Sequence, residues 1–566
     1  MEHTRAFTHT HTPLRSGPAP FAITIPTHQC PQVRPEETFE RVDTIPNWHM
    51  PGTHWYHPHW HGSTGIQAGS CVAGAIIVED TPGYLPPAVA DLEEIPLIMC
   101  PIQPRFLHTF ATDFTEDSCF KTCTDDGYTA EQCSKDPGGA CHDGVWGVPI
   151  PDDAPDVILL TNGRVNPIVT VVANRWYRIR LVYGAEEQAL ELGNSLPGCE
   201  LQLLAKDGVY LPTAPRPIKS AFLGPGNRAD LLIRCSAGIH PLNSGPSDFE
   251  NSTQAVCLSP DLNCSEPFAE AYMETLCNGP CRPDIFSKNL PWATWTHVEH
   301  QGKFNAWNAE PLTPPGSTLP PLATILAVDQ GEVPTELPKF EVNRPCYLVD
   351  LRGQTAAETT HIGFRSCMNT SDACPGGRGV MHDVDTTRFE FQIGHSGSET
   401  DPLEPWGGPH HSQRASEVYF KEPYIDVGTL HEFVVRAAAN WHVLHIHVNP
   451  FQLQHTLIGP YADYFQSGDW HDVLLYPLYK DQEGLIGVPP EEGGALAKIM
   501  MQADYFNGTM IAHCHILHHE DQGMMANYKI AGPEGALWNG AESVDPKCYR
   551  GSSKAGGALA GPPVIL

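Results

Sequence analysis

Short apolar segments recur along the chain between turns rich in proline and glycine. Runs of this kind, with many β-branched and aromatic residues and bounded by turn formers, are typical of β-strands. No stretch shows a long helical period, and the 54 prolines would interrupt a helix. The pattern predicts strands over Ala75–Glu79, Asp156–Leu160, Ile168–Ala173, Trp176–Val182, Leu201–Ala205, Ala229–Arg234, Glu432–Arg436 and Asp472–Tyr476.

Many short strands at this spacing predict an all-β fold of Greek-key sandwiches or barrels. A chain of 566 residues is too long for one core, and the usual domain size suggests about three or four domains. The proline-rich stretch Glu310–Leu337 predicts a linker, and a softer boundary falls at Thr81–Pro87. The predicted division is domain 1 at 1–85, domain 2 at 86–310, a linker at 311–338, domain 3 at 339–548 and a Gly- and Ala-rich flexible tail at 549–566.

The charge balance narrows the classes of partner. The 34 basic and 66 acidic residues give a net charge of −32, which argues against nucleic acid and anionic membranes. A cationic substrate would be favoured, although an acidic surface more commonly serves solubility. The sequence has no run of about eighteen apolar residues, so it predicts no membrane span.

Cysteine usage indicates an oxidising compartment. Two clusters within the 18 cysteines lack the paired CxxC spacing and apolar framing of a zinc ribbon, which favours disulfides over zinc. They are Cys119, Cys123, Cys133 and Cys141, then Cys257, Cys264, Cys277 and Cys281. Four sequons, at Asn251, Asn263, Asn369 and Asn507, are compatible with a secreted glycoprotein. The opening residues MEHTRAFTHTHTPLRSG lack the apolar core of a signal peptide. We therefore expect a secreted protein whose signal sequence is not in this chain.

The 29 histidines include four clusters that carry the candidate chemistry: HTH at His9–His11, HPH at His57–His59, HVLHIH at His442–His447 and HCHILHHEDQGM at His513–Met524. Alternate residues of a strand face the same side, so each HxH pair can present two imidazoles to one cavity. In HCH the flanking histidines would face one site while Cys514 faces another. One strand could thus couple two metal sites through a few covalent bonds.

The ligand types indicate the metal. Two imidazoles, a thiolate and a more distant thioether are the set of a blue-copper electron-transfer site, here His442, Cys514, His519 and Met524. Zinc cannot change oxidation state and has no use for the eight further histidines of the clusters. Those eight suit a polynuclear copper centre. Three nearby histidines fit no ligand role: His61, His455 and His518.

The four clusters resemble the copper-binding motifs of the multicopper oxidases, which include laccases, and occur in the same order. The family's spacings in the third and fourth motifs are reproduced by His442–His447 and His513–Met524. The flanking segments PGTHWYHPHWHGSTGIQ, NPFQLQ, KDGVYLP and LGPGNRADLLIRC also look like laccase-type sequence. The resemblance extends from about His9 to Lys529, with the Cys-rich stretches as insertions.

The resemblance implies three cupredoxin-like sandwich domains and four copper ions that serve the reduction of dioxygen to water. It implies type-1 copper at His442, Cys514 and His519 with Met524 axial, type-2 copper at His9 and His445, and a type-3 pair at His11, His57, His59, His447, His513 and His515. Glu520 resembles an acid that relays protons in related enzymes. The alternative for Glu520 is a solvated residue on a short helical turn.

Two features depart from the family pattern. Thr12 stands where the first motif has glycine, and only eight residues precede His9, where the family has a signal peptide and opening strands. A cupredoxin domain needs those strands to cover sheet edges. The sequence therefore predicts a first domain truncated at its N-terminus.

The leading hypothesis for the substrate is a phenol or aromatic amine, oxidised as by a laccase. The alternative is a metallo-oxidase of Fe(II), Mn(II) or Cu(I), which would need carboxylates or methionines beside the type-1 histidines; Asp472 is a candidate. The 11 methionines, without a Met-rich insert, disfavour a cuprous oxidase. A copper-free extracellular binding protein of this fold is disfavoured by the complete ligand types of the last two motifs. A blue colour would distinguish the enzyme from such a relative.

Overall fold

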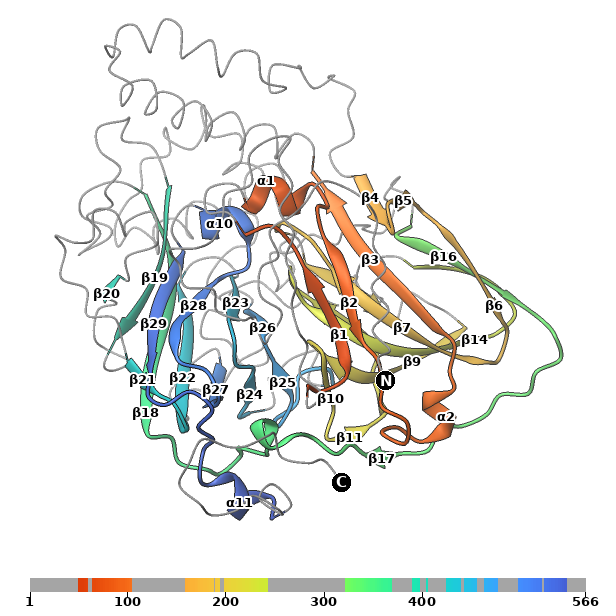
Figure 1. Ribbon diagram of the computed structural model, residues 1–566. Helices are drawn as coiled ribbons and strands as arrows, with labels where there is room; N and C mark the ends of the chain where they lie inside the picture. The colour runs from red at the N-terminus through yellow and green to blue at the C-terminus, as the bar shows by residue number, and fades with distance from the viewer. Residues whose placement is uncertain are drawn as a thin grey trace, which may run out of the picture.

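The computed structural model describes residues 49–59, 64–103, 158–187, 189–193, 198–242, 321–368, 389–396, 404–405, 424–438, 442–455, 463–476, 497–521 and 524–546. This part of the chain is mainly β-strand (Figure 1), which confirms the predicted fold class. Each of the eight predicted strand segments overlaps a strand. The predicted ligands His9 and His11, both Cys clusters and the predicted N-terminal truncation lie outside the described residues.

An N-terminal hairpin pairs β1 (Gly52–Tyr56) with β2 (Gly74–Val78). It is followed by a sheet in the order β10 (Val209–Tyr210), β9 (Cys199–Lys206), β14 (Arg228–Cys235), β7 (Trp176–Tyr183), β3 (Glu94–Ile102), β4 (Ile158–Thr161) and β5 (Arg164–Val165), with β12 (Arg216–Pro217) also on β9. Every residue of β7 is buried, because both faces of this central strand are covered.

A three-stranded sheet of β15 (Gly238–Leu242), β16 (Ala323–Val328) and β6 (Ile168–Val172) packs against the larger one. Leu97 and Ile179 of the larger sheet line the same apolar interior as Val171 and Ile325 of the smaller. We call these two sheets the middle sandwich. Strand β16 lies within the predicted linker 311–338, so that prediction is wrong for this segment. The run ATILAV has no proline and alternates between buried and more exposed positions, as a strand with one buried face does.

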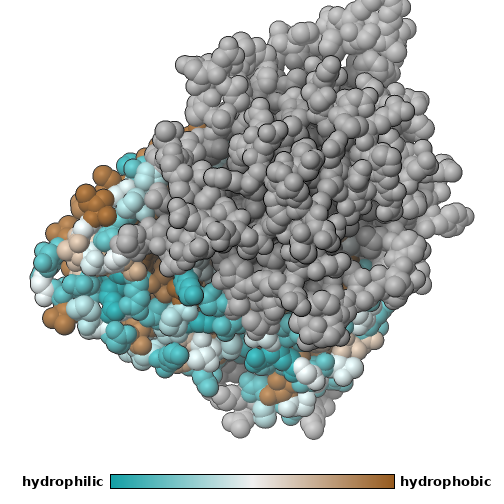
Figure 2. Space-filling model, turned by 180° about the vertical axis from the view of Figure 1, so that it is seen from behind, coloured by the Kyte–Doolittle hydropathy of each residue, from teal (hydrophilic) through white to brown (hydrophobic). Residues whose placement is uncertain are grey.

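The outer face of the three-stranded sheet is apolar and exposed. Ile168, Ile239 and Val328 expose 68%, 71% and 40% of their surfaces, so the sheet contributes only its inner face to the core. Hydrophilic side chains cover much of the described surface in Figure 2. No helix in the described ranges is long and apolar enough to cross a membrane.

Two further sheets form what we call the C-terminal sandwich. One has the order β20 (Glu404–Pro405), β19 (Phe389–Ser396), β18 (Glu358–Met368), β22 (Thr429–Ala438), β27 (Ala497–Ala503), β24 (Phe451–Leu453) and β25 (Trp470–His471). The other has the order β21 (Tyr424–Asp426), β29 (Met525–Ala531), β28 (Gly508–Cys514), β23 (His442–Ile446) and β26 (Val473–Tyr476). Phe433 of the first meets Tyr528 of the second edge to face, with ring centroids 5.8 Å apart.

Short elements connect the N-terminal hairpin and the middle sandwich with the C-terminal part of the fold (Figure 1). Strand β11 (Thr213–Ala214) pairs with β17 (Phe340–Glu341), and helix α1 (Thr64–Gly69) meets helix α10 (Leu517–Asp521). The backbone N–H groups of Thr64 and Gly65 donate to the carboxylate of Asp521, at 3.1 and 2.8 Å. The other short elements are α2 (Pro87–Ala90), η2 (Cys346–Leu348), α11 (Ala541–Val544) and the paired strands β8 (Leu190–Gly193) and β13 (Ser220–Leu223).

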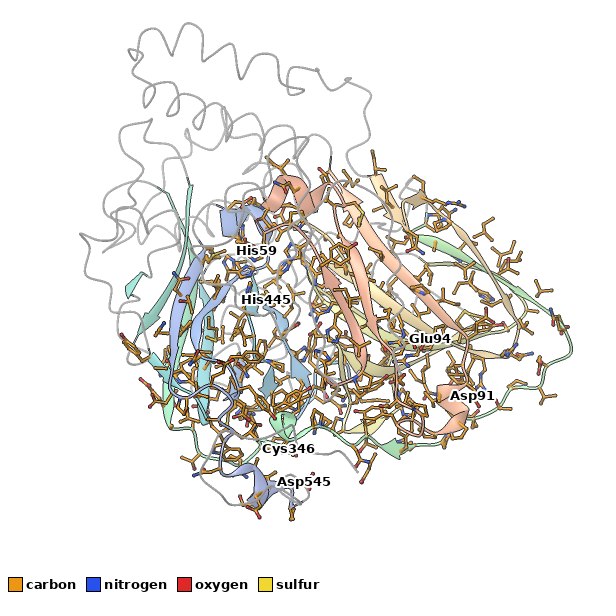
Figure 3. The ribbon with its side chains drawn as sticks, in the orientation of Figure 1. His59, Asp91, Glu94, Cys346, His445 and Asp545 are labelled. Carbon is orange, nitrogen blue, oxygen red and sulfur yellow. A yellow bond between two sulfur atoms is a disulfide. The ribbon has the colours of Figure 1, made fainter. Side chains whose placement is uncertain are left out.

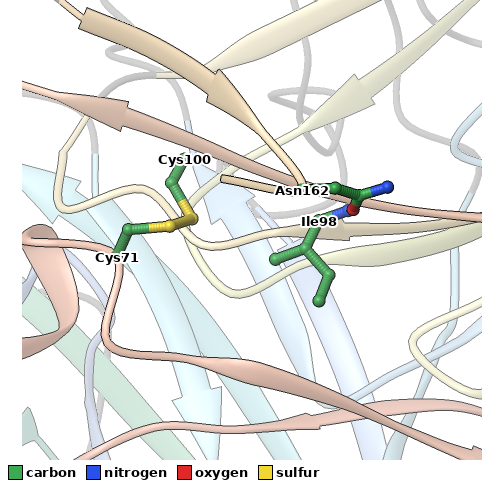
Figure 4. Close-up of a disulfide and its surroundings, with 4 residues drawn as sticks. All are labelled: Cys71, Ile98, Cys100 and Asn162. Carbon is green, nitrogen blue, oxygen red and sulfur yellow. A yellow bond between two sulfur atoms is a disulfide. The ribbon is translucent and has the colours of Figure 1, made fainter. Parts of the chain in front are cut away.

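The described ranges contain disulfides at cysteines outside the two predicted clusters. Cys71, just after α1, is bonded to Cys100 of β3 (Figure 4), and Cys199 of β9 is bonded to Cys235 of β14. Cys514 is the one free cysteine within the described ranges, and it is buried. The sequon residue Asn507 is exposed, as a glycosylated residue would have to be.

A buried ion-pair network fastens the N-terminal hairpin to the middle sandwich. Asp230 accepts hydrogen bonds from the Thr53 hydroxyl and from the guanidinium groups of Arg178 and Arg180, which are 1% and 2% exposed. We expect Asp230→Ala to destabilise the fold by roughly 3–5 kcal/mol, because it leaves two buried cations short of their partner. The matched control Asp350→Ala breaks an exposed pair with Arg352 and should cost about 0–1 kcal/mol. Equal midpoints of thermal unfolding in the two variants would contradict this account.

Candidate metal centre

Three predicted ligands converge between strands β23 and β28. The Sγ of Cys514 lies 3.6 Å from Nδ1 of His442 and 3.7 Å from Nδ1 of His519. All three residues are buried, and their ligand atoms lie within 4.8 Å of one another. These are one sulfur and two imidazole nitrogens at a spacing that a single metal ion can bridge.

Local structure brings this trio together. Strands β23 and β28 pair antiparallel with Leu444 opposite Cys514, and α10 then turns His519 back toward the sulfur. Met524 is fully buried, its N–H donates to the carbonyl of His519 at 2.8 Å, and its carbonyl accepts from Cys514 N–H at 3.0 Å. The sequence predicts Met524 as the axial ligand, and its backbone is fixed to both neighbouring ligands.

The surroundings of the trio are apolar. The Phe364 ring stacks on His442, with centroids 5.2 Å apart. Burial raises the pKa of the Cys514 thiol to about 12 and lowers the pKa of His519 well below its usual range. His519 is therefore neutral, which is the form that binds a metal ion.

Six further predicted ligands form a second cluster beside the first, and Figure 3 shows two of them, His59 and His445, between the sandwiches. The ring centroids of neighbouring members lie 4.7 to 5.6 Å apart. The members are His57 and His59 after β1, His445 and His447 at the end of β23, and His513 and His515 at the end of β28. The Nε2 atoms of His447 and His513 are only 3.0 Å apart.

Backbone carbonyls fix the tautomers of three rings in this cluster, and one of these is His513, whose Nδ1 donates to the carbonyl of Cys514 at 2.9 Å. Nδ1 of His57 donates to the carbonyl of Pro58, and Nδ1 of His445 donates to that of Asp472, both at 2.8 Å. Each bond leaves Nε2 as the unprotonated nitrogen. Burial lowers the pKa of His57 to about 3, and lowers the pKa values of His445, His447 and His515 well below the usual range.

The two sites meet in the HCH segment. The rings of His513 and His515 lie 5.6 Å apart in the six-histidine cluster, whereas the sulfur of Cys514 lies beside His442 and His519. This is the division that strand alternation predicts. The two sites are therefore joined through the backbone of three consecutive residues.

Glu520 lies against the cluster and is only 1% exposed, so the alternative of a solvated residue is wrong. One carboxylate oxygen is 3.3 Å from Nδ1 of His59, and the other is 3.1 Å from Nδ1 of His513. The hydroxyl of Thr64 also donates to this carboxylate, at 3.3 Å. Glu520 thus contacts two of the predicted copper ligands.

Two acidic residues have positions that the sequence does not reveal. Glu186 of the middle sandwich accepts from Nδ1 of His518 at 2.5 Å, and its carboxylate raises the pKa of His518 against the opposing effect of burial. Asp472 is 1% exposed, and both its oxygens bind Arg228, at 2.8 and 2.6 Å. Asp472 therefore does not provide the open carboxylate that a metal-ion substrate would need. No spacing in the sequence predicts that Glu186 contacts His518 or that Arg228 contacts Asp472.

Part of the chain matches a known protein family. Residues 400–533, which include both of the last two motifs, match the family model described as multicopper oxidase. The chain carries a domain of the multicopper oxidase family. The family comprises copper-binding oxidoreductases that use dioxygen. The predicted all-β, cupredoxin-like fold is confirmed.

Several solved multicopper oxidase structures are similar to this chain. That from Pseudomonas thermotolerans is 18% identical, covers 85% of this chain and 77% of its own, and has a TM-score of 0.44. The Campylobacter jejuni metallo-oxidase is 17% identical, covers 85% of this chain and 72% of its own, and has a TM-score of 0.45. McoA from Aquifex aeolicus is 18% identical, covers 85% of this chain and 76% of its own, and has a TM-score of 0.46. No curated protein matches this chain in a sequence search.

Proposed function

We propose that this protein is a copper oxidase that takes electrons singly from a small reducing substrate and delivers them to dioxygen. One observation carries the proposal: the buried trio of His442, Cys514 and His519 shares the HCH segment with a cluster of six histidines. An electron-accepting site and an oxygen-reducing site would thus be covalently connected through Cys514.

The donor sets fit copper. A sulfur with two imidazoles suits a soft, redox-active ion, and neutral imidazoles suit copper in the second cluster. The buried Nδ1 of His515 has no hydrogen-bond partner within the described ranges, and such an atom is costly unless a ligand satisfies it. We assign type-1 copper to His442, Cys514, His519 and Met524. We assign type-2 and type-3 copper to the histidines His9, His11, His57, His59, His445, His447, His513 and His515.

When bound, four copper ions would supply one-electron redox chemistry and the four-electron reduction of dioxygen to water. The protein's own contribution is burial and orientation. Pro58 and Asp472 hold the rings of His57 and His445 through backbone carbonyls. Glu520, which contacts His59 and His513, would hold a proton on its carboxylate beside the second cluster.

For the substrate, we favour a phenol or aromatic amine, on the laccase-type resemblance of the motif flanks. The second candidate is a metallo-oxidase of Fe(II) or Mn(II). It is favoured by a cluster of Glu186, Glu187 and His518, whose ligand atoms lie within 4.8 Å of one another, directly before His519 in the chain. Secretion, which the cysteines and sequons favour, is part of the same proposal.

A steady-state comparison of a diphenol, Fe(II) and Mn(II) on copper-loaded protein tests the substrate class. If phenols are the substrate, diphenol oxidation is faster and is unchanged in the variant Glu187→Gln. A preference for Fe(II) or Mn(II) that this variant abolishes would instead establish the metallo-oxidase. If none of the three is oxidised by blue, copper-loaded protein, both substrate assignments are wrong.

Met524→Leu tests the proposed axial ligand. A weak axial thioether stabilises oxidised copper slightly, and the three other ligands remain in the variant. We therefore expect the blue colour to persist and the type-1 reduction potential to rise in a redox titration. Loss of copper, or a lower potential, would show that the Met524 sulfur is not axial.

A further inference from the structure

The middle sandwich supplies none of the predicted copper ligands, yet one of its turns lies against the histidine cluster. This turn, Gly224–Arg228, joins β13 to β14. A Cβ added to Gly226 would lie 2.7 Å from Nε2 of His515, and one added to Gly224 would lie 3.1 Å from Val443 of β23. The bare backbone of the turn therefore packs directly on His515 and on the strand that carries His445.

The end of the turn reaches His445 by a second route. The Arg228 guanidinium binds both carboxylate oxygens of Asp472, and each residue is 1% exposed. The backbone carbonyl of Asp472 in turn accepts from Nδ1 of His445 at 2.8 Å and from Ile446 N–H at 3.1 Å. Arg228 thus fixes the residue that orients the His445 ring.

Neighbouring residues hold this arrangement from both sides. The Asn227 side chain donates to the carbonyl of Val473 at 2.8 Å and to Asp207 at 3.0 Å. Asp207 also accepts from the backbone N–H of Arg228 and from Nδ1 of His471, both at 3.0 Å. These hydrogen bonds restrain the segment around Asp472 on both sides.

We propose that the turn Gly224–Arg228, together with Asp472, positions the imidazoles of His445 and His515 for copper. This inference rests on the proposed function, in which both histidines are copper ligands. The Asp472 carbonyl sets the tautomer and direction of His445, and the backbone of Gly226 limits the position of His515. Hydrogen-bond partners of metal-binding histidines typically contribute about 10–100-fold to metal affinity.

A pair of aspartate variants separates positioning from general support of the interface. Asp472→Asn weakens the Arg228 pair, while Asp207 remains 3.8 Å from that arginine. In the control, Asp469→Asn, the altered aspartate is as buried as Asp472. Its carboxylate is bound at 2.7 Å by Arg216, which lies in the middle sandwich as Arg228 does. Within the described ranges the Asp469 carboxylate is bound by Lys206, Arg216 and Gln466, none of them a predicted ligand.

For both variants, the copper retained per chain is measured during competition with a chelator, with the type-2 copper signal followed by electron paramagnetic resonance. We expect Asp472→Asn to hold type-2 copper about 10–100-fold more weakly with its blue colour intact. Asp469→Asn should retain copper as the wild type does, even if it unfolds at a lower temperature.

The variants Gly226→Ala and Gly163→Ala test the contact with His515. This test does not require that Asp472→Asn folds. Gly226 and Gly163 both have positive φ, +85° and +73°, so alanine is strained at either position. A Cβ on Gly163 meets no atom within 4 Å. We expect Gly226→Ala alone to lose copper from the histidine cluster.

Asp472→Asn and Gly226→Ala proteins with wild-type copper retention and an unchanged type-2 signal would overturn this inference. A wild-type protein that binds no type-2 copper would instead overturn the proposed function. The two failures are therefore distinguished by the wild-type measurement alone.

Discussion

Cys514→Ser should abolish both the blue colour and the oxidation of any substrate. Among the proposed ligands only a thiolate gives intense blue charge-transfer absorption with copper, and a serine hydroxyl does not replace it. The sulfur also lies at the covalent connection between the two sites, since His513 and His515 flank it in the six-histidine cluster. We expect activity at background level in the variant, measured by dioxygen uptake with copper-loaded protein.

The control for this variant is Met510→Leu. Met510 is also fully buried on β28, and exchanging methionine for leucine conserves volume, so colour and activity should persist at a stability cost under about 1.5 kcal/mol. A Cys514→Ser protein that is still blue would refute the assignment of the trio as type-1 copper.

Glu520→Gln should slow reoxidation of the reduced protein by dioxygen by about 10²-fold or more, the usual contribution of a positioned acid or base. The amide has nearly the same shape and keeps its place beside His59 and His513, but it has no carboxyl proton to give. Anaerobic reduction of the type-1 copper by substrate should proceed at the wild-type rate. Stopped-flow absorbance after mixing with dioxygen measures the effect.

Copper content separates the two roles that Glu520 can have. If Glu520 only orients the rings of His59 and His513, Glu520→Gln will lose copper and its reoxidation rate per bound copper will be unchanged. Full copper with slow reoxidation supports proton supply. Full copper with a wild-type rate would show that neither role is needed.

Local patterns predicted much of the fold and the arrangement of the histidines. Alternation along a strand was enough to assign His513 and His515 to one site and Cys514 to another, because side-chain direction in a strand has a period of two. The linker prediction was wrong at Ala323–Val328, because the prolines on either side concealed a strand that pairs with β15 and β6.

Contacts between distant segments could not be predicted from the sequence. Arg228 and Asp472 are 244 residues apart in the chain, so only the packing of two sandwiches brings them together. The sequence left Asp472 as a candidate for substrate binding, whereas its pairing with Arg228 places it in support of His445. The burial of Glu520 depends in the same way on α1, which lies far from it along the chain.

The central claim is that the trio around Cys514 and the six-histidine cluster act as one oxidase. It is tested most directly by reducing the copper-loaded protein anaerobically with a known amount of substrate and then admitting measured dioxygen. The blue colour should bleach and return, with four substrate electrons consumed for each dioxygen molecule. Copper-loaded protein that is never blue, or that takes two electrons for each dioxygen and accumulates hydrogen peroxide, would contradict the claim.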